Sequence, residues 1–260
     1  ATGIIPRSVL SLVPGEGTVE IIVGGARPAA GTSTARLANL STRGRVTAGN
    51  PLILGFALAG TGTRPVLVRG VGPALNLFGV TGTLPAPRLQ VYDSAGALLA
   101  GNQGLANAPA LAQTAARTGA FPLPAGSADS AALLQLAPGS YTMQIDDPRG
   151  AAGVALAEIY DAGSGGGARL VNVSSRSSAG SGADVLISGF VLEGGHVSRV
   201  LLRGVGPGLA QFGTANPVAD PLLSLYDSTG TALGANDNWV ASVGDIALAA
   251  ARAGAFPLVS

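Results

Sequence analysis

A chain of 260 residues with 47% hydrophobic residues, 11% charged residues and a formal net charge of +1 has no electrostatic reason to bind nucleic acid or an acidic partner. The absence of cysteine excludes disulfides and thiolate metal sites, and the apolar runs are too short to span a bilayer. Because charged residues normally make up about a quarter of a soluble protein, we expect self-association to cover part of this surface. The alternative is a Gly/Ala-rich chain with a surface of Ser, Thr and Asn.

The 40 glycines and 17 prolines separate short apolar runs, which is typical of all-β folds. The sequence VLVRGVGPAL at 66–75 recurs as VLLRGVGPGL at 200–209, so the chain contains a repeat with an offset of 134 residues. We therefore predict an all-β protein of two tandem β-sandwich domains, jelly-roll or Ig-like. The predicted divisions are a donor arm and linker at 1–34, a first domain at 35–163 and a strand-deficient second domain at 164–260.

The first predicted element is SVLSLVPGEGTVEIIV at 8–23, which aligns without a gap with ALLQLAPGSYTMQIDD at 132–147. Each copy has two alternating runs around a Pro-Gly turn and is predicted to form two sequential strands. The interior copy closes the first domain, so we expect the N-terminal copy to be an arm that completes the second. The residues expected to fill that domain's core or interface are Val9, Leu10, Leu12, Val19, Ile21 and Val23.

Residues 24–34 read as a linker that spans at most about 35 to 40 Å. If the two domains follow each other in space, the arm has to pass the whole first domain to reach its own second domain. This favours insertion of the arm into a neighbouring subunit. The alternative is an arm that folds back on its own second domain and gives a closed monomer.

The remaining strands are expected wherever alternating apolar runs end at turn residues. In the first domain they are 36–42, 51–58, 65–69, 88–92, 133–136, 141–145 and 154–160; in the second they are 170–174, 185–191, 199–202 and 222–226. Ala-rich segments predict short helices at 108–117 and 246–252. After its copy of GAFPL the second repeat stops, and the run GVALAEIYD at 153–161 has no counterpart, so one strand of the second domain is unaccounted for.

The sequence RGVGP is the most specific local signal, because glycine permits a positive φ and proline fixes φ at a turn. The arginine of each copy is able to bind a ligand carboxylate. We favour a structural role, in which it holds loop carbonyls or pairs with Asp93 or Asp227. The residues of the two motifs are Arg69, Gly70, Gly72 and Pro73, and Arg203, Gly204, Gly206 and Pro207.

No pattern predicts a catalytic, metal or cofactor site. Asn236-Asp237-Asn238 with Asp245 resembles a fragment of a calcium loop but lacks the bidentate Glu. His196 is the only histidine, and nothing gathers around it in sequence, so we do not expect an enzyme. The glycosylation sequons at Asn39 and Asn172 lie in predicted strands.

The RGVGP block, followed by Phe-Gly, a P-x-L-x-x-YDS strand and an Asn-containing turn, resembles repeats of large exported bacterial proteins. A strand-deficient domain with a spare N-terminal arm resembles, in architecture, donor-strand-complemented subunits of extracellular filaments. These resemblances imply an extracellular or cell-surface location after removal of an export signal.

The predicted function is a structural subunit of an extracellular filament, which polymerises head-to-tail when its arm enters domain two of the neighbour. Its expected partner is itself, with no nucleic acid and no membrane span. The alternative is a monomeric cell-surface adhesive or carbohydrate-binding module with the arm folded back. That alternative predicts an exposed aromatic platform, for which Trp239, the only tryptophan, is the candidate.

Overall fold

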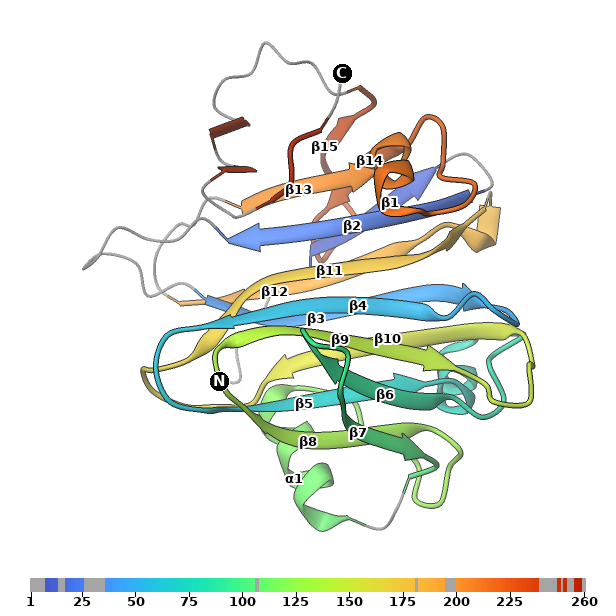
Figure 1. The fold of residues 1–260 in the computed structure, drawn as a ribbon. Helices are drawn as coiled ribbons and strands as arrows, with labels where there is room; N and C mark the ends of the chain where they lie inside the picture. Colours follow the sequence, from blue (N-terminus) through green and yellow to red (C-terminus); the bar gives the residue numbers. More distant parts are fainter. Residues whose placement is uncertain are drawn as a thin grey trace.

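The computed structural model describes residues 8–13, 17–25, 36–105, 108–180, 182–194, 200–238, 247–248, 250–251 and 255–258. For 8–13 and 17–25 it describes the backbone and the strand pairing only. The protein is mostly β, as the sequence predicts, and its large antiparallel sheet curves until it is nearly barrel-shaped (Figure 1). None of the described helices is long and apolar enough to cross a membrane.

Fifteen strands are described, and two of them were not expected from the sequence. The strands are β1 (Ser8–Val13), β2 (Gly17–Gly25), β3 (Arg36–Val46), β4 (Leu52–Ala59), β5 (Arg64–Val71), β6 (Arg88–Asp93), β7 (Leu98–Gln103), β8 (Ser130–Leu136), β9 (Gly139–Asp146), β10 (Gly153–Asp161), β11 (Arg169–Ala179), β12 (Ile187–Glu193), β13 (Val200–Val205), β14 (Leu222–Tyr226) and β15 (Ala232–Asn236). The two unexpected strands are β7 and β15, which carry no apolar alternation and are largely exposed.

The helices are short. The α-helix α1 (Pro109–Thr118) lies one residue from its predicted bounds, and residues 247–248 and 250–251 of the second predicted helix are helical. Two matching 3-10 helices, η1 (Pro73–Phe78) and η3 (Pro207–Phe212), follow the RGVGP motifs, and η2 is Gly182–Asp184. Each of η1 and η3 starts at the motif's proline, whose fixed φ suits the first helical position.

The strand pairing forms two long ladders. Counting the described strands, one ladder runs β15-β14-β1-β12-β3-β10-β5-β8 and has eight strands. The other runs β13-β2-β11-β4-β9-β6-β7 and has seven described strands. A single pair, Ser178 with Arg45, joins β11 to β3 and links the ladders into one sheet. Both ladders contribute to one core, which includes Leu40, Leu54 and Met143.

The two repeats meet strand to strand, with approximate two-fold symmetry. The repeat offset makes β11 the counterpart of β3 and β12 the counterpart of β4. The contacts β3–β12 and β4–β11 are therefore the same contact made twice, as in an isologous dimer interface. Phe190 faces Leu40 in one contact, and Phe56 faces Val173 in the other. Each ladder thus continues through both repeats, while the division into two sandwich domains stays a prediction.

Candidate functional site

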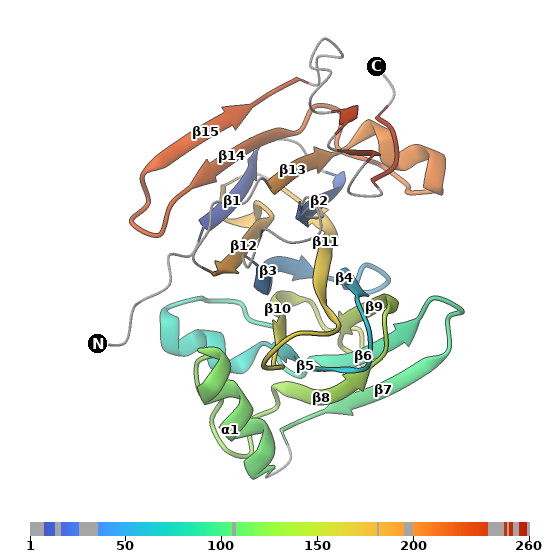
Figure 2. The same ribbon diagram turned by 90° about the vertical axis from the view of Figure 1, so that its left-hand side faces the viewer.

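The candidate site is the place where the N-terminal strands meet the second repeat. Strand β1 lies between β12 and β14, and β2 lies between β11 and β13 (Figures 1 and 2). In register, Val9 faces Gly189 on one side and Tyr226 on the other, while Ile21 faces Ser175 and Gly204. Both strands therefore have hydrogen-bonded neighbours on both sides.

The first repeat has strands of its own in the corresponding places. Strand β9 lies between β4 and β6, which we call the β9 position, and β10 lies between β3 and β5, which we call the β10 position. Thr142 of β9 faces Gly55 and Tyr92, the counterparts of the residues that flank Val9. In the second repeat, β1 thus has the β9 position and β2 has the β10 position.

This placement corrects the ungapped alignment, which matched β1 to β8 and β2 to β9. The apolar pattern of the arm fits the β8 and β9 positions as well as the β9 and β10 positions. In either arrangement the alternating residues Leu10 and Leu12 share one face of their strand, and so do Val19 and Ile21. Only the flanking strands distinguish the two arrangements. Among the described residues, the strand of the first repeat that has no counterpart in the second is therefore β8, not β10.

The β8 position is where β8 pairs with β5 at the end of the eight-stranded ladder. Its counterpart is the outer edge of β13, which within the described part of the chain pairs only with β2. This difference explains why one ladder has eight strands and the other has seven.

The structure also corrects the argument from linker length. Strand β2 pairs with β11, and β11 pairs with β4 of the first repeat, so the second repeat lies beside the first. Residues 26–35, of which the structure describes nothing, connect β2 to β3. Because the arm does not have to pass the whole first repeat, the reach of the linker does not decide between a closed chain and a polymer.

The predicted arm residues occupy positions that correspond to core positions, with one exception. In register, Leu10 and Leu12 match the fully buried Met143 and Ile145. Ile21 and Val23 match Ala157 and Ile159 of β10, which are also fully buried, and Val19 continues that face. Val9 matches Thr142, on the other face of the strand. The arm side chains themselves lie outside the described part.

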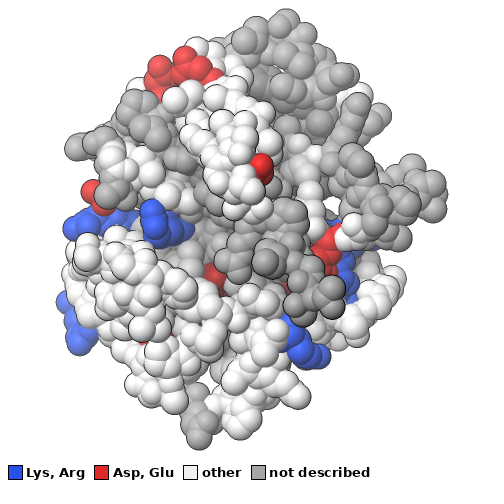
Figure 3. Space-filling view, turned by 180° about the vertical axis from the view of Figure 1, so that it is seen from behind, with Lys and Arg blue, Asp and Glu red and all other residues white. Residues whose placement is uncertain are grey.

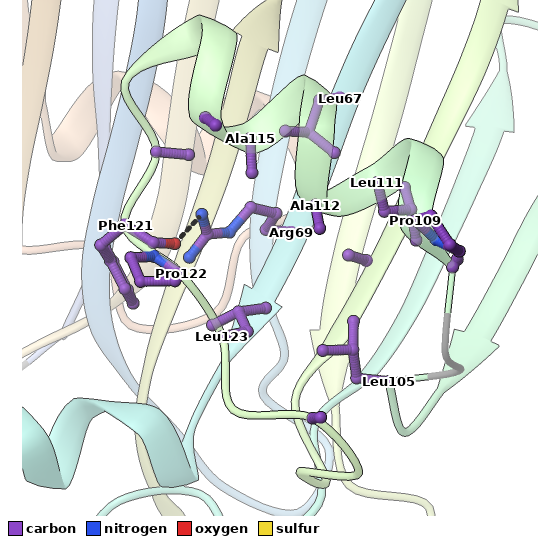
Figure 4. Close-up of a pocket in the computed structure, with 15 residues that line it drawn as sticks. Leu67, Arg69, Leu105, Pro109, Leu111, Ala112, Ala115, Phe121, Pro122 and Leu123 are labelled. Carbon is purple, nitrogen blue, oxygen red and sulfur yellow. Dashed lines mark hydrogen bonds between the residues drawn. The ribbon is translucent and has the colours of Figure 1, made fainter.

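Arg69 of the first RGVGP motif is buried and has both kinds of partner considered in the sequence analysis, a loop carbonyl and a carboxylate, but the carboxylate is not Asp93. Its guanidinium lies 3.0 Å from the Glu158 carboxylate of β10, and Tyr160 donates a hydrogen bond of 2.7 Å to that carboxylate. Arg69 also donates to the Phe121 carbonyl and lies 4.3 Å from the centre of the Phe121 ring (Figure 4). Asp93, the partner suggested by the sequence, instead accepts hydrogen bonds from the backbone of its own turn.

The glycine and proline of the motif form a tight turn around a buried carboxylate. Asp129, which is fully buried, accepts hydrogen bonds from the backbone N–H groups of Gly72 and Ala74. A Cβ on Gly72 would lie 2.0 Å from the Leu84 carbonyl oxygen, so only glycine fits there. Gly206 has the same relation, at 2.0 Å, to the Val218 carbonyl oxygen.

Arg203 repeats part of this arrangement in the second repeat. It is buried, and its guanidinium lies 4.5 Å from the centre of the Phe256 ring, as Arg69 lies over Phe121. Its register partner on β2 is Ile22, whereas the partner of Arg69 on β10 is Glu158. Asp227, the suggested partner, caps its own turn, where hydrogen bonds from Thr229 and Thr231 lower the pKa of its carboxyl.

A cavity of about 330 Å³ lies between α1 and the outer face of β5 and β8. Figure 4 shows its walls, in which Leu111 and Ala115 of α1 face Leu67 and Arg69 of β5. The alanines of α1 are too small to fill the space above the sheet. The lining side chains are apolar apart from Arg69. A second cavity of about 230 Å³ lies beside Arg203 and Phe256.

The other candidates do not come together as a site. Asp146 pairs with Arg88, and Asp147 with Arg149, so both carboxylates of these adjacent acids have arginine partners. Asn39 is buried and donates to the Ile159 carbonyl. His196, Trp239 and Asp245 lie outside the described residues. Among the described residues, no group of three or more His, Asp or Glu is placed to hold a metal ion.

Sequence reasoning missed three buried carboxylates: Asp129, Glu158 and Asp161, which pairs with Arg64. The signal available for Glu158 was a lone acid inside the apolar run GVALAEIYD. Comparison with family models, curated proteins and solved structures gives no match. The resemblance to RGVGP repeats of exported bacterial proteins therefore stays a prediction.

Proposed function

We propose that this protein is the structural subunit of an extracellular filament, and that it polymerises head-to-tail by exchange of its N-terminal arm. The arm of one subunit, residues 8–25, enters the second repeat of the next and takes the β9 and β10 positions there. Each subunit donates one arm and accepts one, so the contact is heterologous and propagates unless it closes a ring.

The observation that supports this proposal is the source of the strands at those two positions. In the first repeat, β9 and β10 belong to the same continuous segment as their neighbours. In the second repeat, the same positions hold strands from the other end of the sequence, connected to β3 by residues 26–35 alone. Strands β1 and β2 pair only with strands of the second repeat among the described strands. An arm from a second copy would therefore make the same backbone pairs.

The energy of pairing is the same whichever copy supplies the arm, so concentration and linker entropy set the balance. Five apolar side chains at core positions contribute roughly 8 to 15 kcal/mol of gross stabilisation, which ordering of the arm and loss of free rotation partly offset. A vacated second repeat would expose strand edges and apolar core to water. We therefore expect an arm to fill the β9 and β10 positions of every second repeat, in the closed chain and in the polymer alike.

The surface supports association that does not depend on charge. On the face shown in Figure 3, charged side chains are few and separated, and most of the described surface is uncharged. Exposed apolar side chains include Phe78, Leu98, Phe212 and Leu233. Contacts between copies on such a surface do not require opposite charges to meet.

A second candidate function is a closed, monomeric cell-surface module, adhesive or carbohydrate-binding, and two observations favour it. The arm pairs with its own second repeat, and the cavity beneath α1 is large enough for a small ligand. The cavity lining is apolar apart from Arg69, however, which suits a hydrophobic ligand better than a sugar.

Negative-stain microscopy and size measurement of the full chain, beside a variant lacking residues 1–25, test the proposal. We expect fibres from the full chain, no fibres from the truncated chain, and truncated protein incorporated at fibre ends when both are mixed. A matched control replaces Leu10 and Leu12 with Asp in the full-length chain, which keeps the arm but makes its core positions polar. A monodisperse monomer at high concentration would refute the filament and leave the closed module.

A further inference from the structure

The outer edge of β13 stands out in the two-fold comparison of the repeats. Strand β5 has β10 on one side and β8 on the other. Strand β13 has β2 in place of β10, and within the described residues nothing in place of β8. An unpaired edge presents backbone N–H and C=O groups to any strand that fits. The residues of this edge are uncharged apart from Arg203, whose side chain is buried.

The sequence of the arm matches the strand that fills this position in the first repeat. Leu10 and Leu12 align with Leu134 and Leu136 of β8, and in both copies a Pro-Gly pair follows two residues after the second leucine. In the closed chain, β1 has the β9 position, although its sequence is similar to that of β8. This similarity indicates a second place where the arm can pair, the β8 position on the outer edge of β13.

We infer that the open edge of β13 is a docking site for strand Ser8–Val13 of a second copy. It is the first contact in the exchange of arms between subunits, and it therefore rests on the proposed function. The β9 and β10 positions are closed on both sides by paired strands, so an incoming arm cannot enter them while the resident arm is in place. Within the described part of the chain, no strand has to be displaced from the edge of β13 before an incoming arm pairs there.

The pairing of β5 with β8 defines the expected register. Leu67 faces Leu133, and Val68 faces Ala132. The repeat offset makes Leu201 and Leu202 the counterparts of Leu67 and Val68, and the arm alignment matches Val9 to Leu133 and Ser8 to Ala132. We therefore expect Val9 of the incoming arm to face Leu201, and Ser8 to face Leu202. Leu10 then keeps its side chain on the core-facing side of the ladder, as Leu134 does.

Disulfide capture between two full-length variants tests this contact, because the chain has no cysteine of its own. One variant carries Val9→Cys and the other Leu201→Cys, so a crosslink can form only between copies. Directly opposed residues of antiparallel strands lie within disulfide range. The matched control acceptor is Leu233→Cys on β15, the exposed edge strand at the end of the other ladder.

We expect the Val9–Leu201 heterodimer to form at least about tenfold faster than the Val9–Leu233 heterodimer. A Ser8→Cys and Leu202→Cys pair should give the same preference, which guards against a local defect in one acceptor. Equal rates with the Leu233 control would overturn the docking site.

Microscopy of the same mixtures separates this inference from the proposed function. Fibres without preferential Leu201 capture overturn the docking site and leave the filament proposal standing. Preferential capture without fibres supports the docking site and overturns the filament. If neither fibres nor preferential capture is found, both are wrong.

Discussion

At the scale of single residues, the fold depends on a few buried charges that hold distant segments together. Arg69, Glu158 and the Phe121 carbonyl join β5, β10 and the loop after α1 at one point. A buried ion pair has lost the hydration of both partners, so removal of one partner leaves the other charge uncompensated. In the first RGVGP motif, Arg69 thus links these segments, and its carboxylate partner is Glu158 of β10.

Glu158→Gln is expected to destabilise the protein by about 3 to 5 kcal/mol, because Arg69 stays buried without its carboxylate. Urea unfolding followed by circular dichroism measures this change. The control is Glu193→Gln, whose carboxylate pairs with the partly exposed Arg36 and should cost about 1 kcal/mol or less. Equal losses in the two variants would contradict the structural role of the buried pair.

The carboxyl of Asp147 gives a prediction about pH. Hydrogen bonds from the Arg149 side chain lower its pKa below the usual value for Asp. A folded-state pKa below the unfolded one gives stability that is present above the unfolded pKa and is lost as pH falls through the folded one. Unfolding free energies measured from pH 7 down to pH 2 should therefore fall in the acid range, with a smaller fall in Asp147→Asn. An unchanged acid profile in that variant would show that Asp147 contributes nothing.

At the scale of elements, the turn of each RGVGP motif fixes where the following 3-10 helix starts. Gly72 and Gly206 allow the chain to pass against a carbonyl oxygen from the segment before β6 or β14. The two turns are copies of each other, so each is an internal control for the other. Any larger residue forces that segment away from the strand.

Gly72→Ala is expected to cost about 3 kcal/mol or more, since its Cβ would meet the Leu84 oxygen at 2.0 Å. Gly206→Ala should disturb the second repeat in the same way, against Val218. Gly234→Ala in β15 has open space around it and should change stability by about 0.5 kcal/mol or less. Thermal unfolding of the three variants measures the contrast, and a tolerated Gly72→Ala would refute the close approach.

At the scale of the whole molecule, the two repeats share one pair of ladders, and among the described strands one ladder is longer than the other by one strand. The N-terminal strands lie inside the ladders, while the edge of β13 lies at an end. Exchange of the arm therefore replaces two strands inside the ladders by those of another copy, whereas docking on β13 adds a strand to the end of a ladder. These two kinds of contact are the means by which copies of this chain are proposed to join.

The low charge of the molecule predicts that assembly tolerates salt. With a net charge of +1 and 11% charged residues, contacts between copies depend on backbone pairing and apolar burial. At 1 M salt the screening length is about 3 Å, which removes surface charge interactions and leaves the others. Fibre length and mass measured at 0.05 M and 1 M sodium chloride should be the same within about twofold. Dissolution of fibres at high salt would contradict this and indicate contacts made by charge.

The sequence by itself determined the mostly β class, the repeat and the positions of most strands, because period-two alternation and Gly/Pro turns are local signals. It also predicted β1 and β2 as strands, and it favoured a structural role for the RGVGP arginines, both of which are buried. Only the tertiary structure decided that β1 and β2 have the β9 and β10 positions of the second repeat, since a shift by one strand position preserves the face of every apolar residue. The sequence likewise did not predict that Arg69 pairs with Glu158. The two residues are 158 − 69 = 89 positions apart, and only the pairing of β5 with β10 brings them together.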